Sequence, residues 1–194
     1  GGSCSTTIPP SSSSPWSNAA LVVTVKSDQL KEKGLMAGLN FQHKIEQDAY
    51  KTSLKYATGR EIPAQTVGEF LKGRVSDKPL PTSSCPSHLF KSDLSELFPA
   101  TVTESLKLGL QEFEKKLPGF TQEGAILMAP ETRTSSPLTI VRDRAKYVSV
   151  SHEGLYPCGE GAGYAGGITS AAVDGVRVAL AILAQEKLLP PAAP

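Results

Sequence analysis

An excess of charge of one sign, aromatic side chains and cysteine are all scarce in this chain. Lys and Arg number 20 against 19 Asp and Glu, and the net charge is +1. This balance predicts no basic surface for nucleic acid or anionic lipid. Aromatic residues make up only 6% of the 194 residues, which leaves few rings on which bases could stack. The 39% of hydrophobic residues is typical of a soluble globular protein.

The three cysteines, Cys4, Cys85 and Cys158, are widely spaced, and no CxxC pair occurs among them. This pattern argues against a disulfide framework and against a zinc site, and it indicates a reducing compartment. The 3 histidines are scattered as well, so we predict no metal site and no catalytic histidine. We expect Cys158 to be a small buried side chain at a strand end, because it has no partner thiol for redox chemistry.

Long apolar runs are missing too. The longest candidate, residues 176–184, contains Arg177 and is much shorter than the about 20 residues that a membrane-spanning helix needs. We therefore expect no membrane span.

The first 18 residues are rich in Gly, Ser, Thr and Pro, which predicts a disordered segment. They lack the basic and apolar regions of a signal peptide. The chain opens with Gly1 and not with methionine, which we interpret as a fragment or a processed product. At the other end, Pro190 and Pro191 begin a short tail.

Apolar periodicity in between predicts a chain of helices and strands, and so an α/β fold class. Helices are expected at residues 38–56, at 102–117 and at 168–187, with one helical turn at 92–97. A short helix is also expected after Pro63, with Val67, Phe70 and Leu71 inward and Gly73 after it. Thr101 and Glu104 have the spacing of a capping box for the helix at 102–117. Strands are expected at residues 19–26, 125–129, 138–141 and 154–158.

A glycine-rich turn between the last predicted strand and helix carries the clearest functional signal. Residues 159–167 read GEGAGYAGG, and Gly161, Gly163 and Gly166 satisfy the pattern GxGxxG. Glycine permits close approach of a ligand, and the N–H groups that open a helix attract anions such as pyrophosphate. The second parallel strand of a dinucleotide-binding unit does not follow, since the chain runs into LLPPAAP. The motif alone therefore leaves a ligand-free tight turn as an equal alternative.

Longer stretches around this turn resemble a known family. GLYPCGEGAGYAGGITSAAVDGVRVA, residues 154–179, resembles the C-terminal signature of a family of uncharacterised FAD-dependent dehydrogenases from bacteria and plastid-bearing eukaryotes. APETRTSSPLTIVRD at residues 129–143 is similar to the family's penultimate motif, and ALVVTV and FQHKIEQDAY resemble its inserted middle region. The N-terminal FAD-binding segment of the family, with its own GxGxxG, has no counterpart in this sequence.

The resemblance implies the C-terminal portion of a single-Rossmann flavoprotein, an α/β fold with a mostly helical (α+β) insertion. The implied parts are a disordered segment at residues 1–18, a substrate-side or cap subdomain at 19–120, the C-terminal part of the FAD-binding domain at 121–189, and a tail at 190–194. FAD is the implied cofactor. The substrate and the electron donor would be small molecules that the sequence does not identify, and the compartment would be the cytoplasm or the chloroplast stroma.

The resemblance also implies residues that contact the cofactor, without naming a catalytic one. They are Gly159, Glu160, Gly161, Gly163, Tyr164, Gly166, Gly167, Ile168, Thr169 and Arg133. Gly159 and Glu160 would meet the ribityl chain or the pyrophosphate, and the helix that opens at Ile168 would face the flavin pyrimidine. Tyr164 would flank the ring or simply pack in the turn. Arg133 would bind an anionic group or pair with a nearby acid.

Farther along the predicted helix, Asp174 and Arg177 are expected to form a surface ion pair one turn apart.

The function expected from these features is that of an FAD-dependent oxidoreductase or a C-terminal fragment of one. Two alternatives remain at this point. The chain is a truncated, non-catalytic binding module, or it is a small phosphate-binding domain that uses only the turn at residues 159–168.

Overall fold

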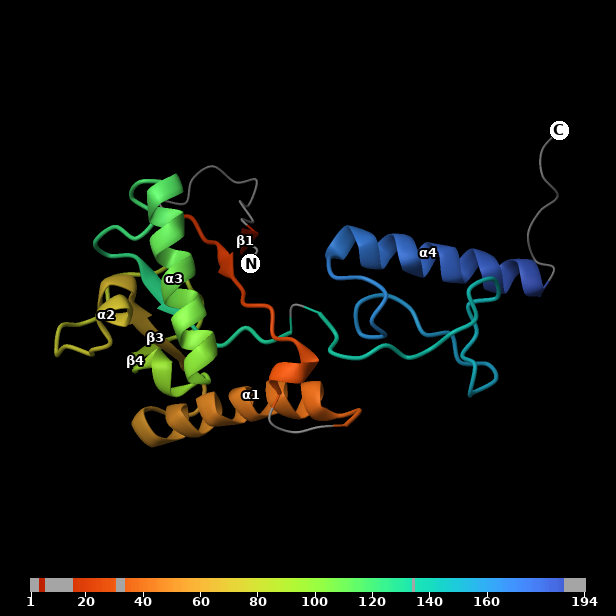
Figure 1. Cartoon of the computed structure of the whole chain (residues 1–194), viewed down its shortest axis with the longest axis horizontal. Helices are drawn as coiled ribbons and strands as arrows, with labels where there is room; N and C mark the ends of the chain where they lie inside the picture. The colour runs from red at the N-terminus through yellow and green to blue at the C-terminus, as the bar shows by residue number, and fades with distance from the viewer. Residues whose placement is uncertain (1–3, 6–15, 31–33, 134, 187–194) are drawn as a thin grey trace. The chain divides into compact units, whose positions relative to one another are not determined.

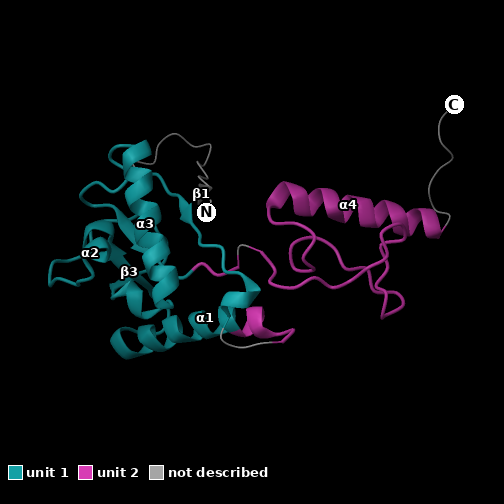
Figure 2. Ribbon diagram, in the orientation of Figure 1, with its two compact units in different colours: residues 1–31, 41–130 teal, residues 32–40, 131–194 magenta. Residues whose placement is uncertain are grey.

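The computed structural model describes residues 4–5, 16–30, 34–133 and 135–186, and every structural statement below concerns these residues (Figure 1). The chain divides into two compact units, drawn in different colours in Figure 2. Unit 1 comprises residues 1–31 and 41–130, and unit 2 comprises residues 32–40 and 131–194. Each unit is described by itself.

The described residues form an α+β fold whose regular elements fall mostly in unit 1. The helices are α1 (Ala37–Tyr56), α2 (Val67–Lys72), α3 (Ala100–Lys116) and α4 (Ile168–Gln185), with the 3-10 turns η1 (Ser27–Gln29) and η2 (Leu94–Glu96). The strands are β1 (Cys4–Ser5), β2 (Ala20–Leu21), β3 (Ile62–Thr66), β4 (Leu89–Lys91) and β5 (Ile126–Met128). The helices predicted at residues 38–56, 102–117 and 168–187 are confirmed to within a few residues, apart from residue 187, which lies outside the described residues.

Two small sheets are present. β1 pairs antiparallel with β2, so Cys4 and Ser5 have a backbone partner, while residues 6–15 of the predicted disordered segment lie outside the described residues. The larger sheet has the order β4-β3-β5, with β4 parallel and β5 antiparallel to β3. The central strand β3 is buried on both faces at Pro63, Ala64 and Gln65, which explains its lack of apolar–polar alternation.

The short helix predicted after Pro63 is confirmed as α2, whereas the strand β3 that precedes it was not predicted. The helix α2 begins at Val67, after Thr66 accepts a hydrogen bond from the backbone N–H of Glu69 as its N-cap. Gly73 ends α2 in the left-handed conformation, at φ 60°.

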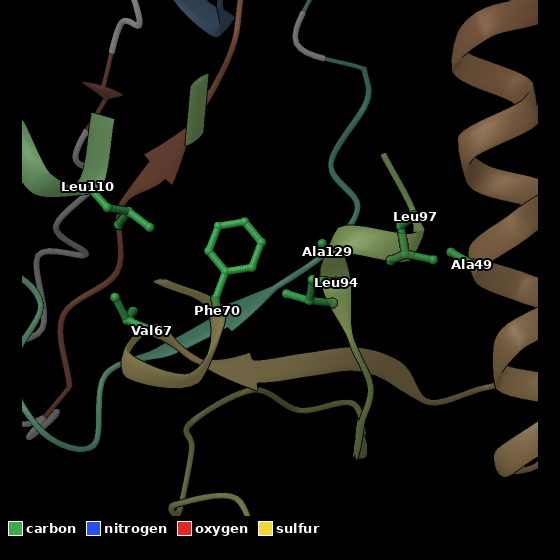
Figure 3. Packing of buried hydrophobic residues seen from close by; sticks show 7 residues of the cluster. All are labelled: Ala49, Val67, Phe70, Leu94, Leu97, Leu110 and Ala129. Carbon is green, nitrogen blue, oxygen red and sulfur yellow. The ribbon is translucent and has the colours of Figure 1, made fainter. Parts of the chain in front are cut away.

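The core of unit 1 gathers where the helices cover the sheet (Figure 3). Phe70 of α2, Leu94 of η2 and Leu110 of α3 are each at most 2% exposed. Val67, Leu97, Ala49 and Ala129 complete the cluster. Ile45 and Ala49 of α1 are buried, whereas Leu54 and Leu117 are exposed.

Polar side chains connect the sheet to its surroundings. Gln65, fully buried, donates to the carbonyl of Arg74 at 3.0 Å and accepts from the backbone N–H of Leu94 at 3.1 Å. Lys91 of β4 forms an ion pair with Glu69 of α2 at 2.9 Å. Burial acts to raise the pKa of Glu69, but hydrogen bonds from Ser76 and Lys91 outweigh it and lower that pKa to about 2.

Three further expectations about local structure are wrong. The helix α3 starts after Pro99 and has no side-chain cap, so Thr101 and Glu104 lie inside it and form no capping box. Residues 19–26 contribute only the two-residue strand β2. Residues 138–141 and 154–158 form no strand: the one bridge of this region pairs Arg142 with Ser149. A strand exists only with a partner, and an apolar run does not reveal whether one is available.

Candidate functional site

The glycine-rich turn lies in unit 2 and is closed by its own backbone. The N–H of Gly163 donates to the carbonyl of Glu160 at 2.9 Å, and the N–H of Tyr164 donates to the carbonyl of Gly159 at 3.0 Å. Gly159 and Gly163 have φ angles of 70° and 82°, which other residues rarely adopt. These two glycines are therefore required by the conformation of the turn.

Gly163 is required for a second reason, which is close packing. A Cβ atom there would lie 2.5 Å from the carbonyl oxygen of Leu138 and 2.9 Å from the Cα of Thr139. The N–H of Ile140 also donates to the carbonyl of Ala162 at 3.1 Å. The segment that we predicted as a strand at residues 138–141 is thus irregular and packs against the turn. Residues 138–142 are called the strap below.

Gly161 and Gly166 differ from Gly163. A Cβ atom at either position would meet nothing within 4 Å, and neither residue is at positive φ. No contact among the described residues requires glycine at these two positions. Absence of a side chain there leaves the backbone open to close approach by another molecule.

Beyond the turn, the start of α4 presents unsatisfied backbone donors. Gly167 is its N-cap and makes no side-chain capping hydrogen bond. The first helical bond runs from the N–H of Ala171 to the carbonyl of Gly167 at 2.9 Å, so the N–H groups of residues 168–170 have no acceptor within the helix. The first turn carries no acidic residue, and Ile168 is 91% exposed. Such an end suits an anion.

Glu160 stands within the turn, half-buried. Its carbonyl takes part in closing the turn, but its carboxylate has no hydrogen-bond or ion-pair partner among the described residues. A carboxylate in this position can accept hydrogen bonds from hydroxyl groups of a ligand.

A buried ion pair that we did not predict lies behind the turn. Arg142 contacts Asp174 through two hydrogen bonds, Nη1 to Oδ2 at 2.9 Å and Nη2 to Oδ1 at 2.6 Å. Their side chains are 8% and 11% exposed. The backbone N–H of Gly159 donates to the same Asp174 Oδ2 at 2.9 Å. The expected surface pair of Asp174 with Arg177 is therefore wrong, because Asp174 is buried and bonded to Arg142.

These contacts set the protonation of the pair. The hydrogen bonds from Arg142 lower the pKa of Asp174, the N–H of Gly159 lowers it further, and burial opposes them. The same hydrogen bonds raise the pKa of Arg142. Both groups are therefore charged at neutral pH. A single acid within an otherwise apolar helix was the signal in the sequence that could have revealed a buried pair.

Tyr164 is engaged with this pair. The Cζ of Arg142 lies 3.6 Å from the centroid of the Tyr164 ring and 4.7 Å from that of Tyr147. The Tyr164 hydroxyl accepts from the N–H of Arg142 and donates to the carbonyl of Ile140, both at 3.1 Å. The Tyr164 ring thus packs on a cation, and this contact connects the turn to the strap.

Two other residues of interest stand apart from these contacts. Arg133 is exposed in the loop that precedes the strap. Cys158 is a free, exposed thiol, which corrects our expectation of a buried one. Cys85 in unit 1 is free and half-buried. Residues 155–158 belong to no helix or strand.

Unit 1 contains an open depression lined in part by Tyr50, Arg60 and Pro130. Its acid, Glu61, accepts hydrogen bonds from the N–H and the hydroxyl of Thr58 at 2.8 Å and 2.7 Å. These bonds lower the pKa of Glu61 to about 2. The carboxylate is thus committed to the local turn, and the glycine-rich turn in unit 2 is the stronger candidate site.

The helix α4 also bears on the membrane expectation. By length and composition alone it is apolar enough to cross a membrane, which the shorter run counted in the sequence did not show. One such helix is weak evidence for a span. Asp174 and Val178 of α4 are buried within unit 2, while Val176 and Leu180 are exposed.

Comparison with known proteins gives the family. The model of a family described as FAD-dependent protein, C-terminal domain-like, matches residues 9–134. An uncharacterized protein of Clostridium beijerinckii is 44% identical over 164 residues, which cover 84% of this chain and 30% of that protein. The chain thus spans less than a third of the length of this relative, and the turn lies beyond the residues that the family model matches. On this evidence, the chain belongs to the family of FAD-dependent proteins, as a C-terminal part.

Proposed function

We propose that this chain is the C-terminal part of an FAD-dependent oxidoreductase of the dehydrogenase type, and that the turn at residues 159–168 closes its flavin site. The observation that carries this proposal is the family match over residues 9–134. When bound, FAD supplies the transfer of a hydride or of electrons, and the protein supplies binding, orientation and electrostatics.

The described residues fit one part of such a cofactor. The free N–H groups at the start of α4 would bind the pyrophosphate, because the helix end has no side-chain cap and no acidic residue in its first turn. The unpartnered carboxylate of Glu160 would accept hydrogen bonds from ribityl hydroxyls. Gly161 and Gly166 would let the backbone approach the cofactor, since nothing in the protein occupies the space of their side chains.

Other members of the predicted site have weaker support. Thr169 opens α4 beside Ile168, and both side chains are exposed. Arg133 carries a positive charge suited to an anionic group, in an exposed loop of the same unit. We keep these residues in the proposal at the periphery of the site.

We propose further that the adenosine is held elsewhere, by a Rossmann-like unit. The larger sheet of the described residues is a three-stranded mixed sheet in unit 1, and unit 2 carries a single isolated bridge. The relative from Clostridium beijerinckii has more than three times the length matched here, which leaves room for such a unit. The predicted division at residue 120, into a cap subdomain and a cofactor part, belongs to this proposal.

The test is flavin retention by the purified chain. The protein is mixed with excess FAD, passed through a desalting column, and its visible absorption spectrum is recorded. Gly161→Val places a side chain in open space, so it leaves the fold intact and obstructs the cofactor. Gly109→Val on α3, also in open space, is the matched control.

We expect the wild type and Gly109→Val to retain flavin, and Gly161→Val and Glu160→Ala to lose it. A folded, colourless wild type would contradict a flavin site in this chain and support the alternative, a non-catalytic binding module. Retention that survives Gly161→Val would place the flavin elsewhere.

A further inference from the structure

The ion pair between Arg142 and Asp174 holds the chain on both sides of Cys158. Nη1 of Arg142 donates to the carbonyl of Pro157 at 2.6 Å. Oδ2 of Asp174 accepts from the N–H of Gly159 at 2.9 Å. The backbone that enters the turn is therefore attached to a charged side chain at the residue before Cys158 and at the residue after it.

The pair also joins three segments that are distant in the sequence. Arg142 and Asp174 are 32 residues apart, one at the end of the strap and the other within α4. Tyr164, which lies within the turn, packs on the Arg142 guanidinium. Its hydroxyl is hydrogen-bonded to the backbone of Arg142 and of Ile140 in the strap. The two ends of the turn, the strap and α4 thus share one buried contact point.

Stability alone gives a weak reason for such an arrangement. A buried ion pair is often no more stabilising than apolar side chains of similar volume, and its best-attested use is to fix a register. Here the register is that between Glu160 and the open N–H groups of α4, the two features that our proposed function assigns to the cofactor. Glu160 follows Gly159, whose N–H is hydrogen-bonded to Asp174. The open N–H groups belong to α4, the helix that contains Asp174.

We propose that Arg142 and Asp174 are positioning residues, which lock the entry of the 159–163 turn to α4 so that Glu160 and the helix N-terminus face one ligand together. This inference rests on the proposed function. The pair itself touches no ligand; it acts through the N–H of Gly159, the carbonyl of Pro157 and the ring of Tyr164.

The test uses the double variant Arg142→Met with Asp174→Leu, because removing both charges together leaves neither one buried alone. The matched control is Lys107→Met with Glu104→Leu, which removes an ion pair of 3.3 Å on α3 in unit 1. Folding is followed by circular dichroism and thermal unfolding. Amide hydrogen exchange at Gly159, followed by NMR, reports the turn without any cofactor, and FAD fluorescence quenching gives the dissociation constant.

We expect the double variant to fold like the wild type, its Gly159 amide to exchange at least about tenfold faster, and its dissociation constant for FAD to rise at least about tenfold. The control should change neither value. Arg142→Lys, which keeps the charge but loses the fork of two hydrogen bonds, should give a smaller change in both, and it decides the matter where the double variant does not fold.

Unchanged exchange at Gly159 would overturn the positioning role, whatever happens to FAD. Faster exchange with an unchanged dissociation constant would leave the pair merely structural and equally overturn the proposal. A wild type that binds no FAD would refute the proposed function and the ligand role with it. In that case the exchange experiment still decides whether the pair holds the turn.

Discussion

At the scale of single residues, the glycines of one motif differ in whether the protein's own structure requires them. Gly163 is needed by its left-handed backbone and by the carbonyl that lies against its Cα. Gly161 is needed by nothing within the protein. The pattern GxGxxG does not separate these cases, because it records the residue type and not the conformation.

This contrast predicts different costs for the same substitution. Gly163→Ala should lower the free energy of unfolding by about 1–3 kcal/mol, because it places a Cβ at positive φ and 2.5 Å from a backbone oxygen. Gly161→Ala should change it by less than about 0.5 kcal/mol. Chemical denaturation of the two variants measures both values. Equal stability of the two proteins would show that the turn relaxes around the added methyl group.

A second prediction at this scale concerns acid. The pKa of Glu69 is lowered from 4.5 to about 2, so its ion pair with Lys91 contributes stability above pH 4.5 that is lost as the pH falls toward 2. Glu69→Gln should therefore flatten the dependence of the unfolding free energy on pH between 4.5 and 2. Glu123→Gln, an exposed change of the same charge, should leave this slope in place. Denaturation series at several pH values compare the three proteins.

At the scale of elements, the long helices and the strand predicted at residues 125–129, which is β5, were predictable, whereas β3 and β4 were not. The helices α1 and α4 show their apolar spacing over five turns of chain or nearly so, and the end of α2 has Gly73 as its signal. The strands β3 and β4 have no such local signal. Pro63 lies in the central strand β3, and the next residue, Ala64, is paired with Lys91 of β4 and Met128 of β5.

The candidate site divides in the same way. The turn at residues 159–167 could be located because its chemistry is contiguous in the sequence. The ion pair behind it could not, because Arg142 and Asp174 are brought together only by the folded strap. The packing of Leu138 against Gly163 was missed for the same reason: an apolar run that would suit a strand is an irregular segment here.

The helix α3 allows a test of the core within one element. Leu110→Ala should lower the free energy of unfolding by about 2–5 kcal/mol, because Leu110 is 1% exposed within the cluster of Figure 3. Leu108→Ala removes the same atoms from a side chain that is 62% exposed. It should lower the free energy of unfolding by less than about 0.5 kcal/mol. Thermal and urea unfolding distinguish the two. A similar cost at both positions would contradict the assigned face of α3.

At the scale of the whole molecule, the chain has two units with separate interiors. Unit 1 contains the sheet and the apolar cluster, whereas unit 2 is held mainly by the turn, the strap and the buried ion pair. In the described residues of this chain, the apolar cluster therefore lies in the unit that does not contain the turn.

This division predicts separable stabilities. Leu110→Ala should speed amide exchange throughout α2 and α3 while the Gly159 amide of unit 2 keeps its wild-type rate, because the two units open as distinct cooperative regions. The Arg142→Met with Asp174→Leu variant should show the reverse pattern. NMR exchange on both proteins checks the prediction. A common change in all amides would mean that the molecule unfolds as a single cooperative region.

The hydrogen bonds from the ion pair to Pro157 and Gly159 have a practical consequence for Cys158. Its thiol is exposed, yet its backbone is anchored on both sides, two residues before Glu160. With Cys4 and Cys85 replaced by serine, a fluorophore could be attached at Cys158 alone. Its point of attachment would be held in place by the two hydrogen bonds, so its fluorescence would report in real time the binding of a molecule at the turn. The protein thus carries its own attachment point for an optical sensor of that event.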